Sequence, residues 1–385
     1  MSYQTLRRPL AMLMMLLCVS CQPASKKEAP GREPRVLASG EMSPQTPEQD
    51  FMGTRQAAER GDPVAQYQLA GFYMTGYGVD QDMDVAYQWT LKAAENGHTD
   101  AQFEVAMILI DSVHTDDQQK ARRWFEACAM AYQKRSNAGD TEAQRRLSWM
   151  YETGNGVMQN TEQAELWAVE AFRREYEAGK TLDTEDLYNL GVAYFQGDVI
   201  EKDFVKAGEI FTKTAEAGLA QAQYSLALFY ANGTAFARDE EKAFYWFTKA
   251  SEQGHDKAQF EAAQRYYYGY GAPQRDLTKA FEIFQLSANQ GNTKSQLMLG
   301  MMYGKGEAPG GKDYVQAAKW LEMTKDDKEF PIGKAFLGMM YLRGDGVLQD
   351  QKKGLQYLEE AAALGDETAL NALQEWHNIQ KNTEF

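Results

Sequence analysis

The residues of this chain that could carry out chemistry are few and lie far apart. Only four histidines occur among 385 residues, and two of them, His98 and His255, recur in similar contexts, NGHTDA and QGHDKA. Imidazole groups bind metals and transfer protons near neutral pH. These two fall in turns that are well separated along the chain, so we do not expect them to share a metal ion. The pattern favours polar turn residues at both positions.

The sequence also lacks the motifs that place nucleophiles, phosphates or metals. It contains no His-Glu-x-x-His, no Gly-x-x-x-x-Gly-Lys-Ser/Thr and no Gly-x-Ser-x-Gly, the signatures of zinc proteases, phosphate loops and serine hydrolases. Cys128 is the only cysteine outside the first 21 residues, and a free cysteine is usually a small buried residue. Carboxylates are plentiful, but the sequence pairs none across a cleft. We therefore predict that the protein is not an enzyme and has no cofactor or metal.

Composition narrows the choice of partners. The chain is 44% hydrophobic and 25% charged, as is ordinary for a folded protein, but its net charge is −15. A nucleic-acid-binding surface must be basic to neutralise phosphates, so this charge argues against nucleic acid. It also disfavours electrostatic adhesion to anionic lipids.

The elements that must position these residues repeat about every 36 residues. The segments AQYQLAGFYMTGYGV (65–79) and AQYSLALFYANGTAF (222–236) share Ala, Leu, Tyr and Gly at equal spacing. Counted from the first Ala position, the units start at Ala65, Ala101, Ala143, Asp186, Ala222, Ala258, Ser295 and Gly333, with a half-unit at Ala369. Residues 54–61 look like the second helix of an incomplete leading unit. A period of this length predicts a solenoid, in which each unit buries its apolar face against its neighbours.

Each unit is predicted to contain two helices. Apolar residues at offsets 0, 4, 5 and 8 from the unit start lie on one face of a first helix. A Gly-x-Gly turn follows in four units, for example Gly76 and Gly78, because glycine adopts the positive φ angles of a helix stop. The second half has small residues around a tryptophan, as in Ala86, Trp89 and Ala93, which allow two helices to approach closely.

These spaced residues resemble the Sel-1-like repeat, a relative of the tetratricopeptide repeat, over residues 54–380. The resemblance implies an all-α fold, a right-handed α-solenoid of about eight units with a C-terminal capping helix, whose concave face holds protein partners. Some cysteine-rich members of the family are linked to β-lactam binding or hydrolysis, but their paired cysteines are missing here, so that activity is not carried over. The second unit departs from the pattern, with IDSVHTDD (110–117) in place of Gly-x-Gly. The second helices of units two and three are longer by six or seven residues, and we expect a local bend there.

The N-terminus reads as an export signal. Arg7 and Arg8 precede LAMLMMLLCV (10–19), an apolar run too short to span a bilayer. It ends in CVSC (18–21), which resembles the lipobox of bacterial lipoproteins, although Cys18 stands where leucine is usual. The resemblance implies cleavage before Cys21 and lipid attachment to it. We predict a signal peptide over 1–20, a disordered tether over 21–50 and the solenoid over 51–385.

The partner-binding residues are predicted from the position of the first helices. By analogy with the tetratricopeptide fold, offsets 2, 6, 9 and 10 face the concave groove. Offset 2 is largely aromatic, and we interpret that stripe as packing between units. Offsets 6, 9 and 10 are freer to contact a partner, because the repeat constrains them less, and large aromatic side chains are good interface anchors. The candidate partner contacts on this basis are Trp149, Phe195, Tyr267 and Tyr268, together with Tyr270, a further extra aromatic of the same unit.

Three functions remain open from the sequence. The leading hypothesis is a non-catalytic periplasmic adaptor, anchored to the outer membrane by its lipid, that assembles or stabilises a cell-envelope complex with protein partners. Gln22, where an Asp would suggest inner-membrane retention, favours the outer membrane; a soluble periplasmic or secreted protein is the alternative. The second hypothesis is a solenoid that binds glycan or peptidoglycan. An envelope enzyme or its regulator is the third, and no nucleophile–base pair supports it.

Overall fold

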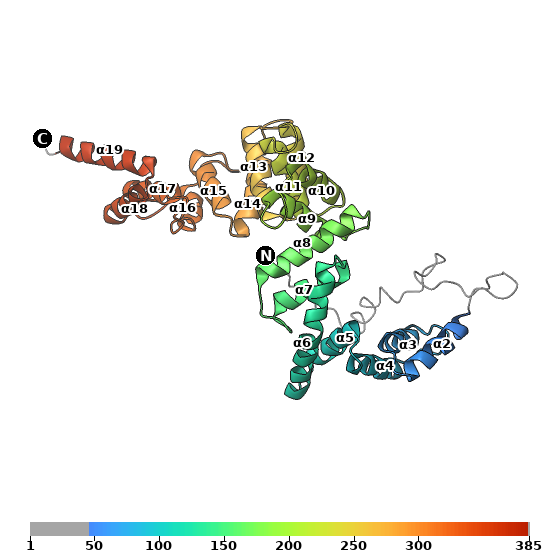
Figure 1. Cartoon of the computed structure of the whole chain (residues 1–385). Helices are drawn as coiled ribbons and strands as arrows, with labels where there is room; N and C mark the ends of the chain where they lie inside the picture. Colours follow the sequence, from blue (N-terminus) through green and yellow to red (C-terminus); the bar gives the residue numbers. More distant parts are fainter. Residues whose placement is uncertain (1–45, 384–385) are drawn as a thin grey trace. The chain divides into compact units, whose positions relative to one another are not determined.

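The computed structural model describes residues 46–383, and the side chains as far as residue 379. Within that range the chain forms 18 helices and no strand, which confirms the all-α prediction (Figure 1). Cys21 and most of the predicted tether lie outside the described residues. The first helix, α2 (Pro47–Glu59), begins before the boundary predicted at residue 51, because Thr46 caps it and Pro47 occupies its first turn. No helix in the described part of the chain has the length and apolar character needed to span a membrane.

The helices alternate as the repeat predicts. The first helices of the eight units are α3 (Pro63–Thr75), α5 (Thr99–Ile110), α7 (Thr141–Thr153), α9 (Thr184–Gln196), α11 (Ala220–Asn232), α13 (Asp256–Tyr268), α15 (Thr293–Lys305) and α17 (Ile332–Arg343). The second helices are α4 (Met83–Glu95), α6 (Thr115–Asn137), α8 (Thr161–Glu177), α10 (Phe204–Glu216), α12 (Glu240–Glu252), α14 (Leu277–Asn289), α16 (Tyr314–Glu322) and α18 (Gln351–Ala363). The C-terminal helix α19 (Glu367–Thr383) packs against α17 and α18, as expected of a cap.

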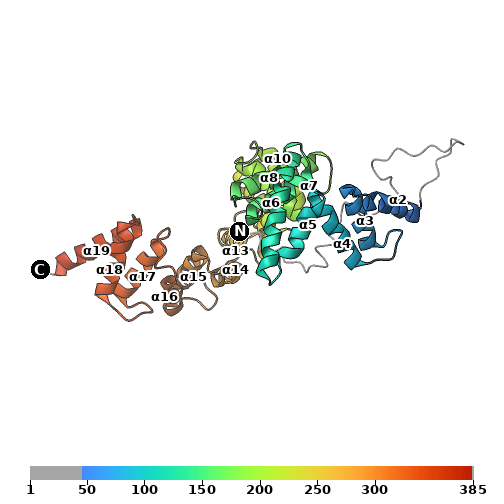
Figure 2. The same cartoon turned by 60° about the horizontal axis from the view of Figure 1, so that its bottom comes forward.

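The chain divides into two compact units, one ending at Lys180 and the other starting at Thr181. Within each unit, consecutive helices lie side by side in both views (Figures 1 and 2). Each unit has its own buried apolar clusters. In the first, Phe103, Phe125 and Met150 belong to one cluster shared by α5, α6 and α7. In the second, Phe260 and Phe284 belong to a cluster shared by α13, α14 and α15.

Capping residues set where the helices start. Asp82, Asn160 and Asp203 precede second helices, and each side chain accepts a hydrogen bond from a backbone N–H of the first turn. The exception is α6, where the Gly-x-Gly turn is missing and His114 makes no side-chain capping bond. Both α6 and α8 are longer than α4, as predicted, but the excess is not six or seven residues in each: they have 23 and 17 residues against 13 in α4.

The two glycines of each Gly-x-Gly turn have different tasks. Gly269 ends α13 in the left-handed region, at φ 80°, with no atom within 3.7 Å of an added Cβ. Gly271 also has a positive φ, 65°, but a Cβ there would overlap the backbone carbonyl of Glu240 at the start of α12. The first glycine therefore provides the helix stop, and the second allows the turn to touch the preceding repeat.

A glutamine one residue after the start of a repeat fixes the register between neighbouring repeats. In six repeats the glutamine side-chain amide donates to the backbone carbonyl eight residues earlier, at the end of the preceding second helix. These residues are Gln66, Gln102, Gln144, Gln223, Gln259 and Gln296. Gln66, Gln223 and Gln259 also accept a bond from a side chain about 30 residues further on. Because buried polar groups must be satisfied, these bonds hold each helix pair in one register.

Candidate partner-binding site

Two of the five predicted partner contacts are largely covered by residues of a neighbouring repeat. The Tyr267 side chain is only 6% exposed and belongs to the cluster between α13 and α15. Its hydroxyl donates to Glu307 at 2.6 Å, and burial, followed by this bond, raises the pKa of Tyr267 to about 12. Trp149 is partly buried against Phe103 and Phe125, with ring centroids 5.5 and 5.3 Å away. Both side chains therefore contribute mainly to packing.

The other three predicted contacts are exposed. Tyr268 and Tyr270, at the end of α13 and in the turn after it, are 49% and 62% exposed. Their rings are stacked, with centroids 5.6 Å apart and planes 19° from parallel. Phe195, at the end of α9, is 42% exposed and its ring lies 5.7 Å from that of Phe204. The structure thus offers two exposed aromatic pairs. Tyr268 and Tyr270 lie at and just after the end of α13, and Phe195 at the end of α9 pairs with Phe204 at the start of α10.

The aromatic stripe at offset 2 packs between helices, as predicted. Phe103 and Phe260 are 4% and 8% exposed. Tyr67 and Tyr224 stack on His98 and His255, with centroids 4.3 and 4.7 Å apart. The two histidines are N-cap residues: each Nδ1 accepts a bond from the backbone of Ala101 or Ala258. Burial lowers the pKa of both histidines, in keeping with the neutral imidazole that the capping bond requires.

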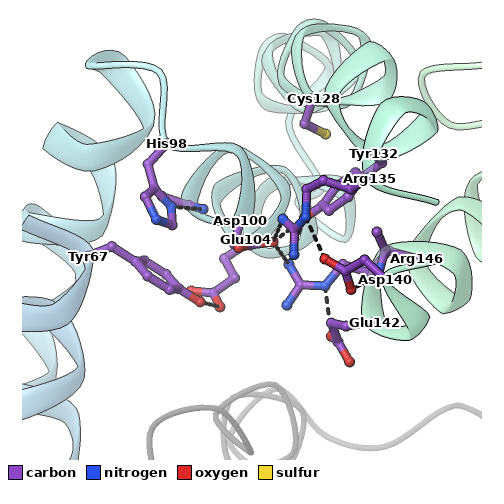
Figure 3. Close-up of polar contacts among 12 residues, drawn as sticks. Tyr67, His98, Asp100, Glu104, Cys128, Tyr132, Arg135, Asp140, Glu142 and Arg146 are labelled. Atoms are coloured by element: carbon purple, nitrogen blue, oxygen red, sulfur yellow. Dashed lines mark hydrogen bonds and ion pairs between the residues drawn. The ribbon is translucent and has the colours of Figure 1, made fainter. Parts of the chain in front are cut away.

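A group of half-buried charges around the buried Arg146, in the first compact unit, was not predicted from the sequence (Figure 3). Asp100, on α5, accepts bonds from Tyr132 and Arg135 of α6, each at 2.9 Å, and from Arg146 of α7 at 3.1 Å. Burial would raise the pKa of Asp100, but the two guanidinium groups and the tyrosine hold it below its usual value. Tyr132 and Arg135 lie near the C-terminal end of the long helix α6, so the extra length of α6 supplies these partners.

A second carboxylate of the group, Glu104, is bonded to the preceding repeat. The hydroxyl of Tyr67, on α3, points to the Glu104 carboxylate and donates to it (Figure 3). Burial raises the pKa of Glu104 to about 7, although the bond from Tyr67 and the charge of Arg146 act in the opposite direction. Glu104 is therefore an acid that titrates near neutral pH inside the stack of helices.

The chemistry available to this group is limited by its bonding. Arg146 donates to Asp100 and to the Tyr132 hydroxyl, and Asp100 also accepts from Tyr132 and Arg135. These bonds join α5, α6 and α7. Cys128 lies apart from the ion pairs and donates to the Phe125 carbonyl at 3.3 Å; burial raises the pKa of its thiol to about 12, as in an inert buried cysteine. Among the described residues, no group of histidine, cysteine and acidic side chains is arranged to hold a metal ion.

The repeats identify the class of protein. A family model described as Sel1 repeat matches residues 63–98, 99–131, 141–174, 184–219, 220–255, 256–292, 293–326 and 331–366. The chain therefore belongs to the Sel1 repeat family. Proteins built from this repeat are typically non-catalytic scaffolds that bind other proteins.

Solved structures show the same fold. A protective antigen of uropathogenic Escherichia coli strains, which displays an SLR fold, is 28% identical with a TM-score of 0.55. The match covers 83% of this chain but only 65% of the antigen, so this chain spans less than two thirds of that protein. A Sel1 repeat protein from Oxalobacter formigenes is 24% identical with a TM-score of 0.51, and the match covers 94% of this chain and 99% of that one.

Proposed function

We propose that this protein is a non-catalytic scaffold that is anchored to the outer membrane through a lipid on Cys21 and faces the periplasm, where it assembles or stabilises a cell-envelope complex. The observation that carries the proposal is the exposed, stacked pair Tyr268–Tyr270 within an array of Sel1 repeats. Tyrosine buries a large area at low entropic cost and keeps a hydroxyl for hydrogen bonding, which suits it to the centre of an interface.

The membrane part of the proposal is supported by the N-terminal sequence. The apolar run 10–19 and CVSC (18–21) fit a lipoprotein signal. Several acyl chains on one cysteine would anchor the protein stably, whereas one chain would bind only reversibly. The segment between Cys21 and α2 is rich in proline, serine and charge, a composition suited to a tether that lets the repeats reach a partner.

The scaffold proposal is tested by photo-crosslinking in intact cells from position 268. A crosslinking residue replaces Tyr268, and the matched control carries it at Tyr245, a tyrosine of similar exposure, 52%, on the second helix α12. We expect one strong protein adduct from position 268 that is absent from position 245. Equal adducts at both positions, or none from 268 or 195, would contradict binding at these aromatic pairs.

The anchor is tested separately. Cys21→Ser should abolish labelling by radioactive palmitate and move the protein out of the outer-membrane fraction. Cys18→Ser should change neither, because the resemblance assigns the lipid to Cys21 alone. A Cys21→Ser variant that keeps its label and its membrane fraction would contradict the anchor while leaving the scaffold untouched.

Glycan binding is a second candidate function, favoured by the same stacked pair. Two near-parallel exposed rings form a flat apolar surface on which the C–H face of a sugar could rest. Calorimetric titration with peptidoglycan fragments would distinguish it. Binding that persists at high salt and is lost in Tyr268→Ala would replace the protein partner by a glycan.

A further inference from the structure

The last two repeats line an open pocket that neither the repeat pattern nor the aromatic pairs explain. It lies between the first helix α15, the second helix α16 and the next first helix α17, and its volume is about 250 Å³. Its walls are largely apolar, formed by Met301, Leu321, Phe336, Met339 and Met340 among others. All of these residues belong to the second compact unit.

A glycine creates the space. Gly304 lies at offset 9 of its repeat, the position at which the first two repeats have Met74 and Ile110. A Cβ added at Gly304 would meet no atom within 4 Å, so the residue is not required for helix packing. Gly300, one turn earlier, differs, because a Cβ there would lie 2.6 Å from Leu321. Gly300 therefore brings α15 against α16, and Gly304 leaves the pocket open.

Two cations line the same pocket from different helices. Lys305 of α15 and Arg343 of α17 both occupy offset 10, the position of Tyr268 in the preceding repeat, and both are exposed. Within the described part of the chain neither forms an ion pair or a side-chain hydrogen bond. Asp345 is the one acidic residue of the lining, so the pocket carries a net positive charge in a chain whose net charge is −15.

Helix stability does not account for these cations. A basic residue in the last turn of a helix interacts favourably with the helix dipole. However, the first helices α3, α5, α7, α9 and α11 have no basic residue in that turn. The same helix end is thus stable without a cation in five repeats. In a sixth, α13, the basic residue is Arg265, which is buried and paired with Glu240 and Glu261. Among the described first helices, exposed cations without an ion pair in this turn therefore occur on the two that line the pocket.

The volume of the pocket and the residues that line it together indicate which kind of ligand it can bind. A water molecule occupies about 30 Å³ in the liquid, so the volume corresponds to roughly eight waters, which is close to one large side chain and below the range of drug-sized sites. Methionines in the walls can adapt to side chains of different shape. Cations from two helices suit carboxylates on both sides of an apolar residue better than a single terminal carboxylate.

We propose that this pocket binds an acidic peptide segment of a protein partner, in which one large apolar side chain enters the space beside Gly304 and flanking Asp or Glu carboxylates pair with Lys305 and Arg343. The proposal rests on the scaffold function and names the chemistry of its partner. The shared offset of Tyr268, Lys305 and Arg343 extends the predicted groove over three consecutive first helices.

Fluorescence anisotropy on the full chain with synthetic peptides tests this. The probe is a labelled, C-terminally amidated heptapeptide in which Phe stands between two Glu residues in a Gly-Ser background. We expect saturable binding that weakens at least 10-fold when Phe is replaced by Ala, and several-fold when both Glu are replaced by Gln. A peptide that ends in Phe with a free carboxylate should bind less well; tighter binding by it would overturn the assignment of two flanking carboxylates.

Variants of the protein locate the binding. Gly304→Met fills the pocket with the side chain that the first unit has at this offset, and it should reduce affinity at least 10-fold without loss of helical circular dichroism. Lys305→Gln with Arg343→Gln should reduce affinity several-fold and flatten its salt dependence, whereas Lys319→Gln, an exposed cation of α16 outside the lining, should change neither.

The two proposals fail in different ways. Absence of peptide binding, or binding that Gly304→Met leaves unchanged, would overturn the pocket assignment. Because the crosslink from position 268 needs no peptide of this kind, a specific adduct there would leave the scaffold function standing when the pocket assignment fails.

Discussion

At the scale of single residues, the stability of the first compact unit depends on charged side chains that lie between its helices. Arg146 is only 6% exposed, and it pairs with Asp100 and with Glu142. A buried ion is costly unless its partners replace the water it loses, and removal of one partner leaves the other uncompensated. Asp100 is compensated by two arginines and a tyrosine, whereas within residues 46–383 the Tyr67 hydroxyl alone donates to Glu104.

Glu104 should make the first unit less stable as pH rises. Its pKa is about 7 in the folded protein and about 4.5 in the unfolded chain, so between these values the folded state holds the extra proton. The resulting loss of stability, up to about 3 kcal/mol, is spread over pH 4.5 to 7. Glu104→Gln should therefore protect the α5 amides from hydrogen exchange at pH 8 relative to the natural chain, with little difference at pH 5.

Two neighbouring variants separate charge from structure. Glu142→Gln removes a carboxylate of the same group whose side chain is 57% exposed, and it should leave the pH dependence in place. Tyr67→Phe removes the donor to Glu104 and should lower protection most at pH 8. If Glu104→Gln exchanged as fast as the natural chain at pH 8, ionisation of Glu104 would not limit the stability of α5.

At the scale of elements, we predict that alanine substitution at the two glycines of a Gly-x-Gly turn lowers stability by different amounts. Gly269→Ala should cost about 1 kcal/mol, because alanine is strained at positive φ but has room. Gly271→Ala should cost several times more, about 3 kcal/mol or above, because its Cβ must also displace the backbone of Glu240. Urea denaturation followed by circular dichroism compares the two, and equal costs would show that the contact between repeats is not rigid.

The helix pairs could be predicted because each depends on short-range signals. Alanines at fixed spacing, Asp and Asn caps and a terminal glycine lie within one unit, and each is visible in the sequence. The groove residues were harder to assign: Tyr267 and Tyr268 are adjacent, yet the first is buried and the second is half exposed. Offset from the unit start cannot distinguish them, because exposure there depends on how the next repeat, with Glu307, lies over the end of α13.

The charged group around Asp100 could not be predicted from the sequence for a related reason. Asp100, Arg135 and Arg146 come from three helices, and each taken alone is typical of a solvated helix face. Only the extra length of α6 brings Arg135 to Asp100. The sequence indicates the pocket only weakly, through a glycine at offset 9 followed by a lysine at offset 10. These two residues predict a binding site only once Arg343 of the next repeat is known to lie beside them.

At the scale of the whole molecule, the chain forms two compact units that divide between Lys180 and Thr181, and each contains buried apolar clusters of its own. The clusters around Phe51, Val105 and Phe125 lie in the first unit. Those around Phe247 and Phe284 lie in the second. Since a solenoid is stabilised by contacts between neighbouring repeats, each unit should have enough internal contacts to fold by itself.

We therefore expect a chain divided at 180/181 to give two fragments, 46–180 and 181–385, that are each helical and melt cooperatively. The control is a division at 139/140, which falls in a half-buried turn between α6 and α7 and separates Phe125 from Met150 of one buried cluster. Its N-terminal fragment should lose cooperativity, because it exposes the α6 face that α7 covers. Calorimetry with circular dichroism makes the comparison. Cooperative melting after both cuts would mean that the repeats are stable in smaller groups than the two units, and loss of structure after both would mean that stability depends on the intact array.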